Sequence, residues 1–301
     1  MKIIVLGAAA GGGFPQWNSR AEPCRRARRN DPVARARTQA GVAVSQDGER
    51  WFLLNASPDL RTQIERTPAL HPREGLRSTP IAGVVLAGGD VDAIAGLLTL
   101  RERQPFALLA TREIHGVLDA NPIFDVLARD VVERRVVPLD TEVVIDSNMT
   151  VELFAVPGKV PLYLEQRDAD ALPVAADGVT VGVMLRSRSA TMLYVPGCAA
   201  MTPALARRID GTDLVLFDGT LWRDDEMIVA GIGTKTGRRM GHMSVAGPDG
   251  TFEAFRSRDV RRKVLIHINN SNPILLDDSL ERAALDAAGW EVAYDGMEMT
   301  L

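Results

Sequence analysis

The chain has 301 residues, 46% of them hydrophobic and 25% charged, and 35 Lys and Arg against 39 Asp and Glu give a net charge of −4. The apolar fraction is sufficient for a packed core and excludes a disordered chain. The slightly acidic balance gives no overall cationic field that would bind nucleic acid or an anionic membrane.

Cysteine and histidine are both scarce. The two cysteines, Cys24 and Cys198, are too few for a disulfide framework or a thiolate zinc cluster, and unpaired cysteines favour a cytoplasmic location. The histidines set an upper limit on any histidine-built metal site, and there are four: His71, His115, His242 and His267.

The chain opens with a short apolar run, residues 3–6, that leads into a glycine-rich loop over residues 7–14. We interpret the run as a buried strand rather than a signal peptide, because no cleavage region follows it. The glycine spacing does not fit a dinucleotide fingerprint, so the loop is predicted to bring the backbone close to the floor of a site. No stretch of about 18 apolar residues occurs, and no membrane span is predicted.

Further short apolar runs, bounded by Gly, Pro, Asp and Asn, predict strands along the whole chain. The predicted strands are residues 3–6, 42–44, 51–55, 81–87, 106–110, 151–156, 179–185, 191–195, 214–217, 263–268 and 291–294. Helical periodicity predicts helices at residues 93–104, 111–118, 203–209 and 279–288. Because regular βαβ alternation is absent, we expect one mixed α/β domain over residues 1–301, with two sheets and helices outside.

Two irregular segments interrupt this pattern. The basic run at residues 24–30 is predicted to be a solvated surface loop, with an anion-binding patch as the less favoured alternative. Residues 163–178, rich in Asp and Ala, are the predicted flexible excursion.

Carboxylates follow two of the predicted strands. Asp90 and Asp92 come after residues 81–87, where they fit a cation site or general acid/base chemistry. The alternative, which the spacing alone favours, is that one of them caps the helix beginning near Ala93. Asp218, followed by Gly219, ends another strand and fits either a sheet-edge active site or a simple turn.

Two histidines and a basic loop complete the candidate residues. His242 lies in a Gly- and Ser-flanked loop, which favours a functional role, whereas His267 lies within a strand and is a core residue unless carboxylates meet it there. The segment 233–237 lacks the full Walker spacing, but its loop would place Lys235 and Arg238 beside an acidic substrate. His71 and His115 are assigned no role.

Motifs distributed along the chain resemble one known family from end to end, the pyrroloquinoline quinone (PQQ) synthesis protein B family. They are GGGFPQWN (11–18), LNASPD (54–59), HPREGLR (71–77), GLLTLRE (96–102), VPGKVP (156–161), LFDGT (216–220), GTKTG (233–237), MGH (240–242) and HINNSNP (267–273).

The resemblance implies a metallo-β-lactamase-like fold, an αββα sandwich of two mixed sheets flanked by helices. The H-x-H-x-D-H metal loop of that superfamily falls on Gly88, Asp90, Asp92 and Ala93. The later histidine falls on Lys159, and the Asp and the final His of the pattern fall on Asp218 and His267. The first metal position is therefore dismantled, and dinuclear zinc hydrolysis is not expected. Ala93 is a further departure, because the family usually keeps a histidine there.

The family's N-terminal C-x-C-x-x-C zinc motif is also broken here. Ser19 and Ala21 occupy its first two positions and only Cys24 remains. The sequence thus predicts no structural zinc in this loop.

The resemblance implies a single divalent transition metal, with Fe(II) favoured because a histidine and carboxylates with open positions suit oxygen-activating iron. The expected metal ligands are Asp92, Asp218, His242 and His267, where His242 or Asp90 fills the gap left by Ala93. Catalytic roles are expected for Asp90, Asp92 and His242. Substrate contacts are expected from Lys235, Arg238, Asn269 and Asn270, and the basic residues 25–29 are further candidates for neutralising substrate carboxylates.

Two functions are compatible with this resemblance, both in the synthesis of PQQ. One is iron-dependent hydroxylation of the tyrosine ring of a cross-linked Glu-Tyr precursor. The other is a non-catalytic carrier that binds PQQ or its precursor and aids its transport to the periplasm. The expected partners are PQQ or the Glu-Tyr-derived precursor, with other PQQ-pathway proteins and a second copy of the chain as further candidates.

Overall fold

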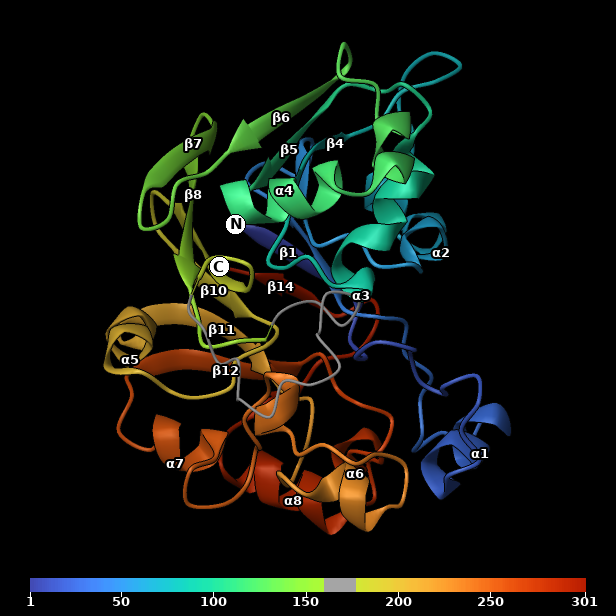
Figure 1. Cartoon of the computed structure of the whole chain (residues 1–301), viewed down its shortest axis with the longest axis vertical. Helices are drawn as coiled ribbons and strands as arrows, with labels where there is room; N and C mark the ends of the chain where they lie inside the picture. Colours follow the sequence, from blue (N-terminus) through green and yellow to red (C-terminus); the bar gives the residue numbers. More distant parts are fainter. Residues whose placement is uncertain (160–176) are drawn as a thin grey trace.

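Two seven-stranded sheets face each other in the centre of the molecule, and helices cover their outer sides (Figure 1). The computed structural model describes residues 1–159 and 177–301. The predicted arrangement of two sheets with helices outside is confirmed.

The first sheet has the strand order β14-β1-β2-β3-β4-β5-β6 and is antiparallel at one end and parallel from β3 to β6. Its strands are β1 (Lys2–Gly7), β2 (Gly41–Ser45), β3 (Trp51–Leu54), β4 (Ile81–Val85), β5 (Phe106–Ala110), β6 (Val132–Val136) and β14 (Glu298–Thr300).

The second sheet has the order β13-β12-β11-β10-β9-β8-β7, and its parallel part runs from β10 to β13. Its strands are β7 (Glu142–Asp146), β8 (Met149–Ala155), β9 (Val181–Ser187), β10 (Thr191–Val195), β11 (Thr212–Asp218), β12 (Val260–Ile266) and β13 (Glu291–Val292).

The helices divide between the two outer faces. In Figure 1, α2, α3 and α4 lie on the side of the first sheet and α5, α7 and α8 on the side of the second. The helices are α1 (Glu22–Arg28), α2 (Leu60–Arg66), α3 (Val91–Ile94), α4 (Arg112–Asp119), α5 (Pro203–Ile209), α6 (Glu226–Val229), α7 (Thr251–Phe255) and α8 (Leu280–Ala287). Short 3-10 turns are η1 (Pro68–Leu70), η2 (Ala95–Leu100), η3 (Pro122–Val126), η5 (Arg238–Met240) and η6 (Pro273–Leu275).

Strand β11 shows how the second sheet is buried on both sides. Leu214 and Leu216 belong to the core between the sheets, whereas Val215 and Phe217 belong to a separate core under α5, α7 and α8. Successive side chains of a strand point to opposite faces, so a continuous apolar run is expected for a strand covered on both sides. The burial of β11 extends to its last residue, Asp218, which is fully buried.

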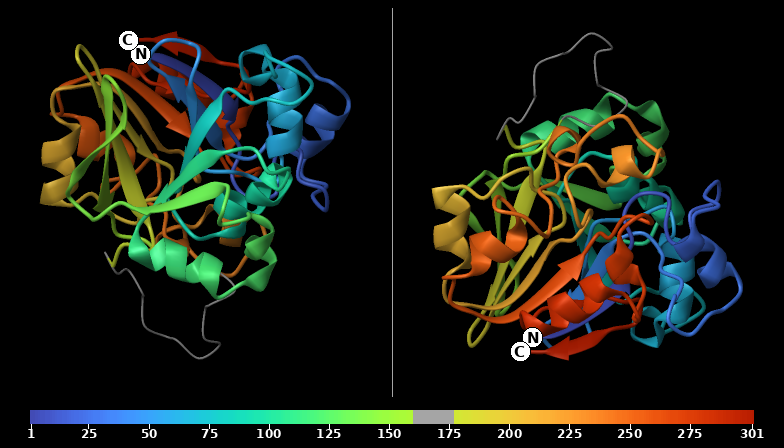
Figure 2. Two further views of the ribbon diagram at one scale, coloured as in Figure 1. Left: turned by 90° about the horizontal axis from the view of Figure 1, so that it is seen from above. Right: turned by 90° about the horizontal axis from the view of Figure 1, so that it is seen from below.

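The chain ends meet on the first sheet, where β1 pairs antiparallel with β14 and the Met1 amino group donates to the Leu301 carbonyl at 2.7 Å. Both turned views in Figure 2 place the two termini side by side. Within residues 1–159 and 177–301, no helix combines the length and apolarity needed to cross a bilayer.

The sequence patterns missed three edge strands. β6 (VERRV), β7 (EVVID) and the short β14 carry charged residues, as sheet edges commonly do, and so lack the apolar run that identifies the central strands. The predicted helix at 93–104 is instead α3 followed by the 3-10 turn η2. A side chain on Gly96 would place its Cβ 2.0 Å from the Ser57 carbonyl oxygen, so this segment packs too closely on the backbone for another residue.

The prediction of a solvated loop for residues 24–30 is wrong for most of the segment, because residues 22–28 form helix α1 with Cys24 and Ala27 buried. Its arginines are largely paired within the chain. Arg26 binds Asp31 and Asp278, and Arg28 donates to backbone carbonyls. The predicted flexible excursion lies outside the described residues, apart from its last two positions.

Candidate metal centre and its cavity

The carboxyl ends of several strands from the two sheets meet at one place. β11 ends at Asp218, β12 ends one residue before His267, and β4 is followed by the loop that carries Asp90 and Asp92. Polar side chains at the carboxyl ends of parallel strands commonly form the ligand sites of α/β proteins.

Asp218 is the most buried polar group of this region, with no exposed surface. Its Oδ2 accepts hydrogen bonds from the Cys198 amide at 2.9 Å and from His242 Nδ1 at 2.8 Å. Its Oδ1 accepts from the amide and hydroxyl of Thr220, at 3.0 and 2.7 Å. These bonds compensate the loss of hydration, since a buried carboxylate is costly unless it is hydrogen-bonded.

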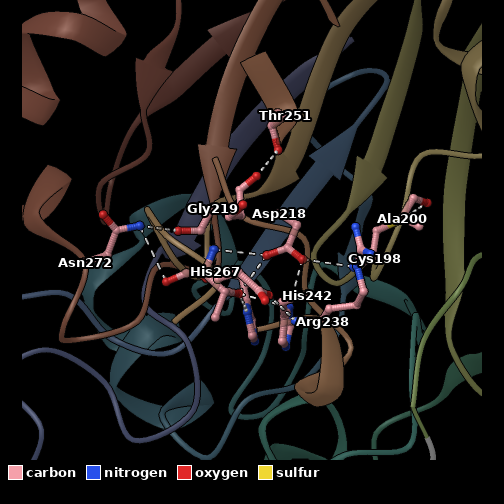
Figure 3. A network of polar contacts seen from close by, with 12 residues as sticks. Cys198, Ala200, Asp218, Gly219, Arg238, His242, Thr251, His267 and Asn272 are labelled. Carbon is pink, nitrogen blue, oxygen red and sulfur yellow. Dashed lines mark hydrogen bonds and ion pairs between the residues drawn. The ribbon is translucent and has the colours of Figure 1, made fainter. Parts of the chain in front are cut away.

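The His242 and His267 rings lie stacked, with centroids 5.2 Å apart and an interplanar angle of 18°. Figure 3 shows the two rings side by side next to Asp218. Because the carboxylate of Asp218 only accepts, it favours the His242 tautomer with a proton on Nδ1 and leaves Nε2 free to act as a ligand. A Cβ on Gly197 would lie only 3.2 Å from His242 Cε1, so glycine there makes room for the ring.

His267 connects the centre to the first sheet. Its Nε2 lies 2.9 Å from Asp92 Oδ2, and its backbone has a φ of +59°, a left-handed conformation that is uncommon for a residue other than glycine. Burial alone would lower the pKa of His267, but the hydrogen bond to Asp92 and the charges of Asp92, Asp218 and Asp90 outweigh it and raise that pKa above its usual value. Burial alone would raise the pKa of Asp92, but the hydrogen bond and the charge of His267 outweigh it and lower that pKa. Asp92 and His267 therefore each favour the charged form of the other.

Thr220 joins all three groups through one hydroxyl. Besides Asp218, its Oγ1 lies 2.8 Å from His267 Nδ1 and 3.0 Å from His242 Nδ1. A protonated His267 can then donate from Nδ1 to Thr220 and from Nε2 to Asp92, which fixes the ring plane. No role was expected for Thr220 from the sequence; its position two residues after the strand-end Asp218 is the signal that could have indicated one.

These side chains border a cavity of about 470 Å³. Gly11 and Gly12 line it, so the glycine-rich loop brings its backbone to the wall of this cavity. Asp90, Asp92, Ala93, His242, His267 and Asn269 also line it. Asp90 occupies the N-cap position of α3, but neither it nor Asp92 makes a side-chain capping bond, so the capping alternative is not what the structure shows.

The cavity also contains residues to which the sequence analysis gave no role. Asn55 has a left-handed backbone, with a φ of +64°, and its Oδ1 accepts from the Ala87 amide at 2.8 Å in the loop that leads to Asp90. Gln39 binds the Gly12 amide through Oε1 and Asp59 through Nε2. Both side-chain amides hold segments of the cavity wall in position. A single Asn or Gln in a strand or loop forms no sequence pattern that would predict such a role.

The predicted substrate-binding residues are only partly brought together. Asn269 lines the cavity, while the adjacent Asn270 is buried and binds Gln16 and Asn269. Lys235 and Arg238 are not among the described lining residues, and Arg238 is half exposed with Asp249 3.7 Å away.

The remaining histidines and the N-terminal cysteine lie elsewhere. His71 binds the Glu65 carbonyl and His115 the Arg135 carbonyl, and neither lines the cavity. Cys24 is buried in α1, with its Sγ 3.6 Å from Asn270 Oδ1.

Within the described residues, one group of three or more His, Cys, Asp or Glu side chains could hold a metal ion. It consists of Asp218, His242 and His267, whose ligand atoms lie within 4.8 Å of one another. Asp92 is a direct neighbour of this group through His267. Two imidazoles with one or two carboxylates are a donor set that suits Fe(II) or Zn²⁺, so the residues present fit a mononuclear transition metal.

Comparisons with known proteins agree with this geometry. A family model described as a beta-lactamase superfamily domain matches residues 50–268, consistent with the metallo-β-lactamase-like sandwich expected from the sequence. Among curated proteins, the chain is similar to the coenzyme PQQ synthesis protein B of Gluconacetobacter diazotrophicus, with 60% identity over 99% of both chains. It is also similar to that of Methylorubrum populi, with 52% identity over the full length of both.

Solved structures show the same likeness. The structure of Zn²⁺-bound PqqB from Methylobacterium extorquens is 51% identical, covers 100% of both chains and has a TM-score of 0.97. A diphosphatase of the PhnP family, at 20% identity, covers 99% of this chain and 96% of its own with a TM-score of 0.69, which shows a shared fold.

Proposed function

The chain belongs to the coenzyme PQQ synthesis protein B family, and we propose that it acts in PQQ biosynthesis as a metal-dependent hydroxylase of the tyrosine ring of a cross-linked Glu-Tyr precursor. The observation that carries this proposal is the cluster of Asp218, His242 and His267 at the edge of a cavity large enough for a small aromatic ligand.

The ligand chemistry supports one metal rather than two. Gly88 and Lys159, which stand at two histidine positions of the superfamily pattern, both line the cavity and supply no imidazole there. A dinuclear hydrolase needs ligands for two metal ions. This donor set fits better a single metal ion with open coordination positions at which dioxygen could react. The Zn²⁺-bound relative supports uptake of a divalent transition metal by a protein of this kind.

Asp218, His242 and His267 would hold the metal, with Asp92 as a fourth ligand or as the partner that orients His267. A bound Fe(II) would supply dioxygen activation. The overall change inserts one oxygen atom of dioxygen into an aromatic C–H bond, while the other oxygen leaves as water with two protons and two electrons from an external reductant. Asp90 lines the cavity and is proposed to accept the proton that leaves the ring carbon.

The carrier remains the alternative because Ala93 lines the cavity where a further ligand is expected. A carrier would bind PQQ or the precursor in the same cavity and release it unchanged. The two functions differ in one measurable respect, the incorporation of oxygen into the precursor.

The test begins with anaerobic reconstitution of the chain with Fe(II) and measurement of metal per chain. We expect a stoichiometry near one that is lost in the double variant Asp218→Ala with His267→Ala. It should be retained in His71→Ala, the matched control, since His71 lies outside the cavity.

The reconstituted protein is then given the Glu-Tyr precursor, a reductant and isotopically labelled dioxygen, and the product is analysed by mass spectrometry. Incorporation of labelled oxygen supports the hydroxylase. Metal binding without incorporation, together with tight binding of PQQ by calorimetry, would support the carrier. Absence of metal from the reconstituted chain would refute the hydroxylase.

A further inference from the structure

Lys159 is the only lysine or arginine among the described residues that line the cavity. It follows Gly158 at the end of the segment that continues strand β8, and its side chain is partly buried. Although Lys159 stands where the superfamily pattern has a metal-binding histidine, an ammonium group is a donor and not a metal ligand at neutral pH. Its presence in the cavity therefore needs another explanation.

Contacts on both sides fix the position of Lys159. Its carbonyl accepts from Thr180 Oγ1 at 3.2 Å. A Cβ on Gly241 would lie 3.1 Å from Lys159 Cγ, so the aliphatic stem passes directly over the residue that precedes His242. Gly241 has a φ of +88°, and glycine there both adopts the left-handed backbone and leaves room for the lysine stem.

The ammonium group of Lys159 has no hydrogen bond or ion pair to any residue in the described part of the chain; the one polar contact of this residue is made by its carbonyl. The amide side chains of the same walls are already used within the fold. Gln39 Nε2 donates to Asp59, Asn55 Oδ1 accepts from Ala87, and Asn269 Nδ2 donates to Ser271. Lys159 is thus a cavity donor whose charge is not committed to any described residue.

The carboxylates of the cavity make such a cation necessary for an anionic ligand. Asp90 and Asp92 both line it, and Asp92 pairs with His267. A ligand with carboxylate groups would meet these negative charges unless a positive charge faced it. A partly desolvated ammonium–carboxylate contact is stronger than a neutral hydrogen bond and restricts the ligand's orientation.

We propose that Lys159 is the group that recognises a carboxylate of the ligand and orients it relative to the His242–His267 face of the cavity. The identity of the ligand as PQQ or its Glu-Tyr precursor rests on the proposed function, whereas the presence of a carboxylate-binding cation does not. Lys159 takes over the role that the sequence analysis gave to Lys235, Arg238 and residues 25–29.

The experiment compares Lys159→Met, which keeps the aliphatic stem, with Lys159→Arg, which keeps the charge, in the metal-reconstituted full chain. The probes are PQQ, the Glu-Tyr precursor, the methyl ester of PQQ with neutral carboxyl groups, and isophthalate, a small aromatic dicarboxylate. Arg261→Met, at an exposed position on β12, is the matched control for loss of a cation. Metal per chain is measured for each variant to show that the centre is intact.

We expect Lys159→Met to bind PQQ and isophthalate at least about tenfold more weakly than the original chain, and Lys159→Arg and Arg261→Met to lose much less. Binding of the methyl ester should be weak in the original chain and unchanged by Lys159→Met. A purely structural role of Lys159 would instead weaken the binding of every probe, the methyl ester included.

A direct readout is available because the chain has only four lysines, Lys2, Lys159, Lys235 and Lys263. After reductive methylation with labelled formaldehyde, the Lys159 signal is assigned by its loss in Lys159→Arg. We expect that signal to shift on titration with isophthalate and not with the ester.

The outcomes separate this inference from the proposed function. If isophthalate binds through Lys159 but PQQ and the precursor do not bind, the inference holds and the proposed function fails. If PQQ binds equally to the original chain and Lys159→Met, the inference is overturned and the proposed function stands. If no carboxylate probe binds the original chain, both are overturned.

Discussion

His267 Nε2 and Asp92 Oδ2 lie 2.9 Å apart although 175 residues separate them in the sequence. Asp92 belongs to α3, which follows β4 of the first sheet, whereas His267 follows β12 of the second sheet. This pair is therefore a bond between the two halves of the sandwich as well as part of the candidate metal centre. It is reinforced nearby by the backbone bonds of Ile268 with Ala8 and Ala10.

The first prediction concerns metal affinity and pH. A metal needs an unprotonated nitrogen of His267, and the pKa of His267 is raised by its acidic neighbours, so protons compete with the metal below that pKa. We expect the apparent affinity for a divalent metal to fall by up to about tenfold per pH unit as the pH is lowered through this range. Calorimetry in buffers of different ionisation enthalpy should show proton release near neutral pH. The same affinity at all pH values from about 6 to 8 would contradict this account.

The second prediction concerns the stability of the metal-free protein. The lowered pKa of Asp92 stabilises the fold above the unfolded-state value of about 4, and this contribution is lost as the pH falls through the folded-state pKa. The raised pKa of His267 stabilises it below about 6.5, and this contribution is lost as the pH rises through the folded-state pKa. The charged pair therefore contributes most between about pH 4 and 6.5.

Asp92→Asn removes this charged pair. We expect it to lower the free energy of unfolding by about 1–3 kcal/mol near pH 5.5 and by less at pH 9, as measured by urea denaturation. Asp249→Asn, whose side chain is 80% exposed, is the control and should show little change. Equal losses for Asp92→Asn at both pH values would mean that the pair acts through packing rather than charge.

The third prediction uses Gly197. A methyl group at this position would lie 3.2 Å from His242 Cε1, so Gly197→Ala must displace the ring by a few tenths of an ångström. Metal affinity should fall by about tenfold while the unfolding free energy changes little, because ligand geometry is more sensitive than packing at the cavity wall. Gly116→Ala is the control, because a Cβ at that position would have no atom within 4 Å. Gly211→Ala is unsuitable, because Gly211 has a φ of +81°. Unchanged metal affinity in Gly197→Ala would exclude His242 as a ligand held in this position.

The fourth prediction tests the hydroxyl that links the three groups. Thr220→Val removes the contacts of Oγ1 to Asp218, His242 and His267 but keeps the side-chain volume. We expect a loss of about 10–100-fold in metal affinity, because outer groups that orient metal-binding histidines have effects of this size. Thr220→Ser keeps the hydroxyl and should retain most of the affinity. If Val and Ser behave alike, the hydroxyl does not orient the ligands.

The fifth prediction restores the residue that the family resemblance places after the second aspartate. Ala93 lines the cavity and has 6% of its surface exposed. Ala93→His should add an imidazole and raise metal affinity by about tenfold or more, measured by competition with a chelator. Ala93→Leu fills the same space without a ligand and should not raise it. An affinity that stays the same in Ala93→His would show that position 93 does not face the metal.

The central strands could be predicted because their burial is written in local periodicity. Strand β11 is apolar at four successive positions and is covered on both faces, and the predicted segment 214–217 lies within Thr212–Asp218. Helices α4, α5 and α8 were also predicted to within a residue or two, and in the structure Thr111, Thr202 and Ser279 cap them. Edge strands β6 and β7 were not, because one side of an edge faces solvent and tolerates charge.

The candidate site was predicted in the same uneven way. Residue types at strand ends made Asp92 and Asp218 candidates and loop context favoured His242, but His267 entered the expected ligand set only through the family resemblance. The sequence could not show that Lys235 and Arg238 lie outside the lining residues while Lys159 lies among them, because a solvated and a cavity-facing lysine look alike in one sequence.

By itself, the sequence determined which segments are buried and which chemical groups stand at their ends, since both follow from the order of apolar and polar residues along a few turns or strands. Only the tertiary structure decided which of those ends meet. The stacking of one sheet on the other brings Asp92 to His267, and the pairing of β11 with β12 in the second sheet brings Thr220 to His267. That registration depends on packing across the whole core between the sheets, a long-range property that no local pattern contains.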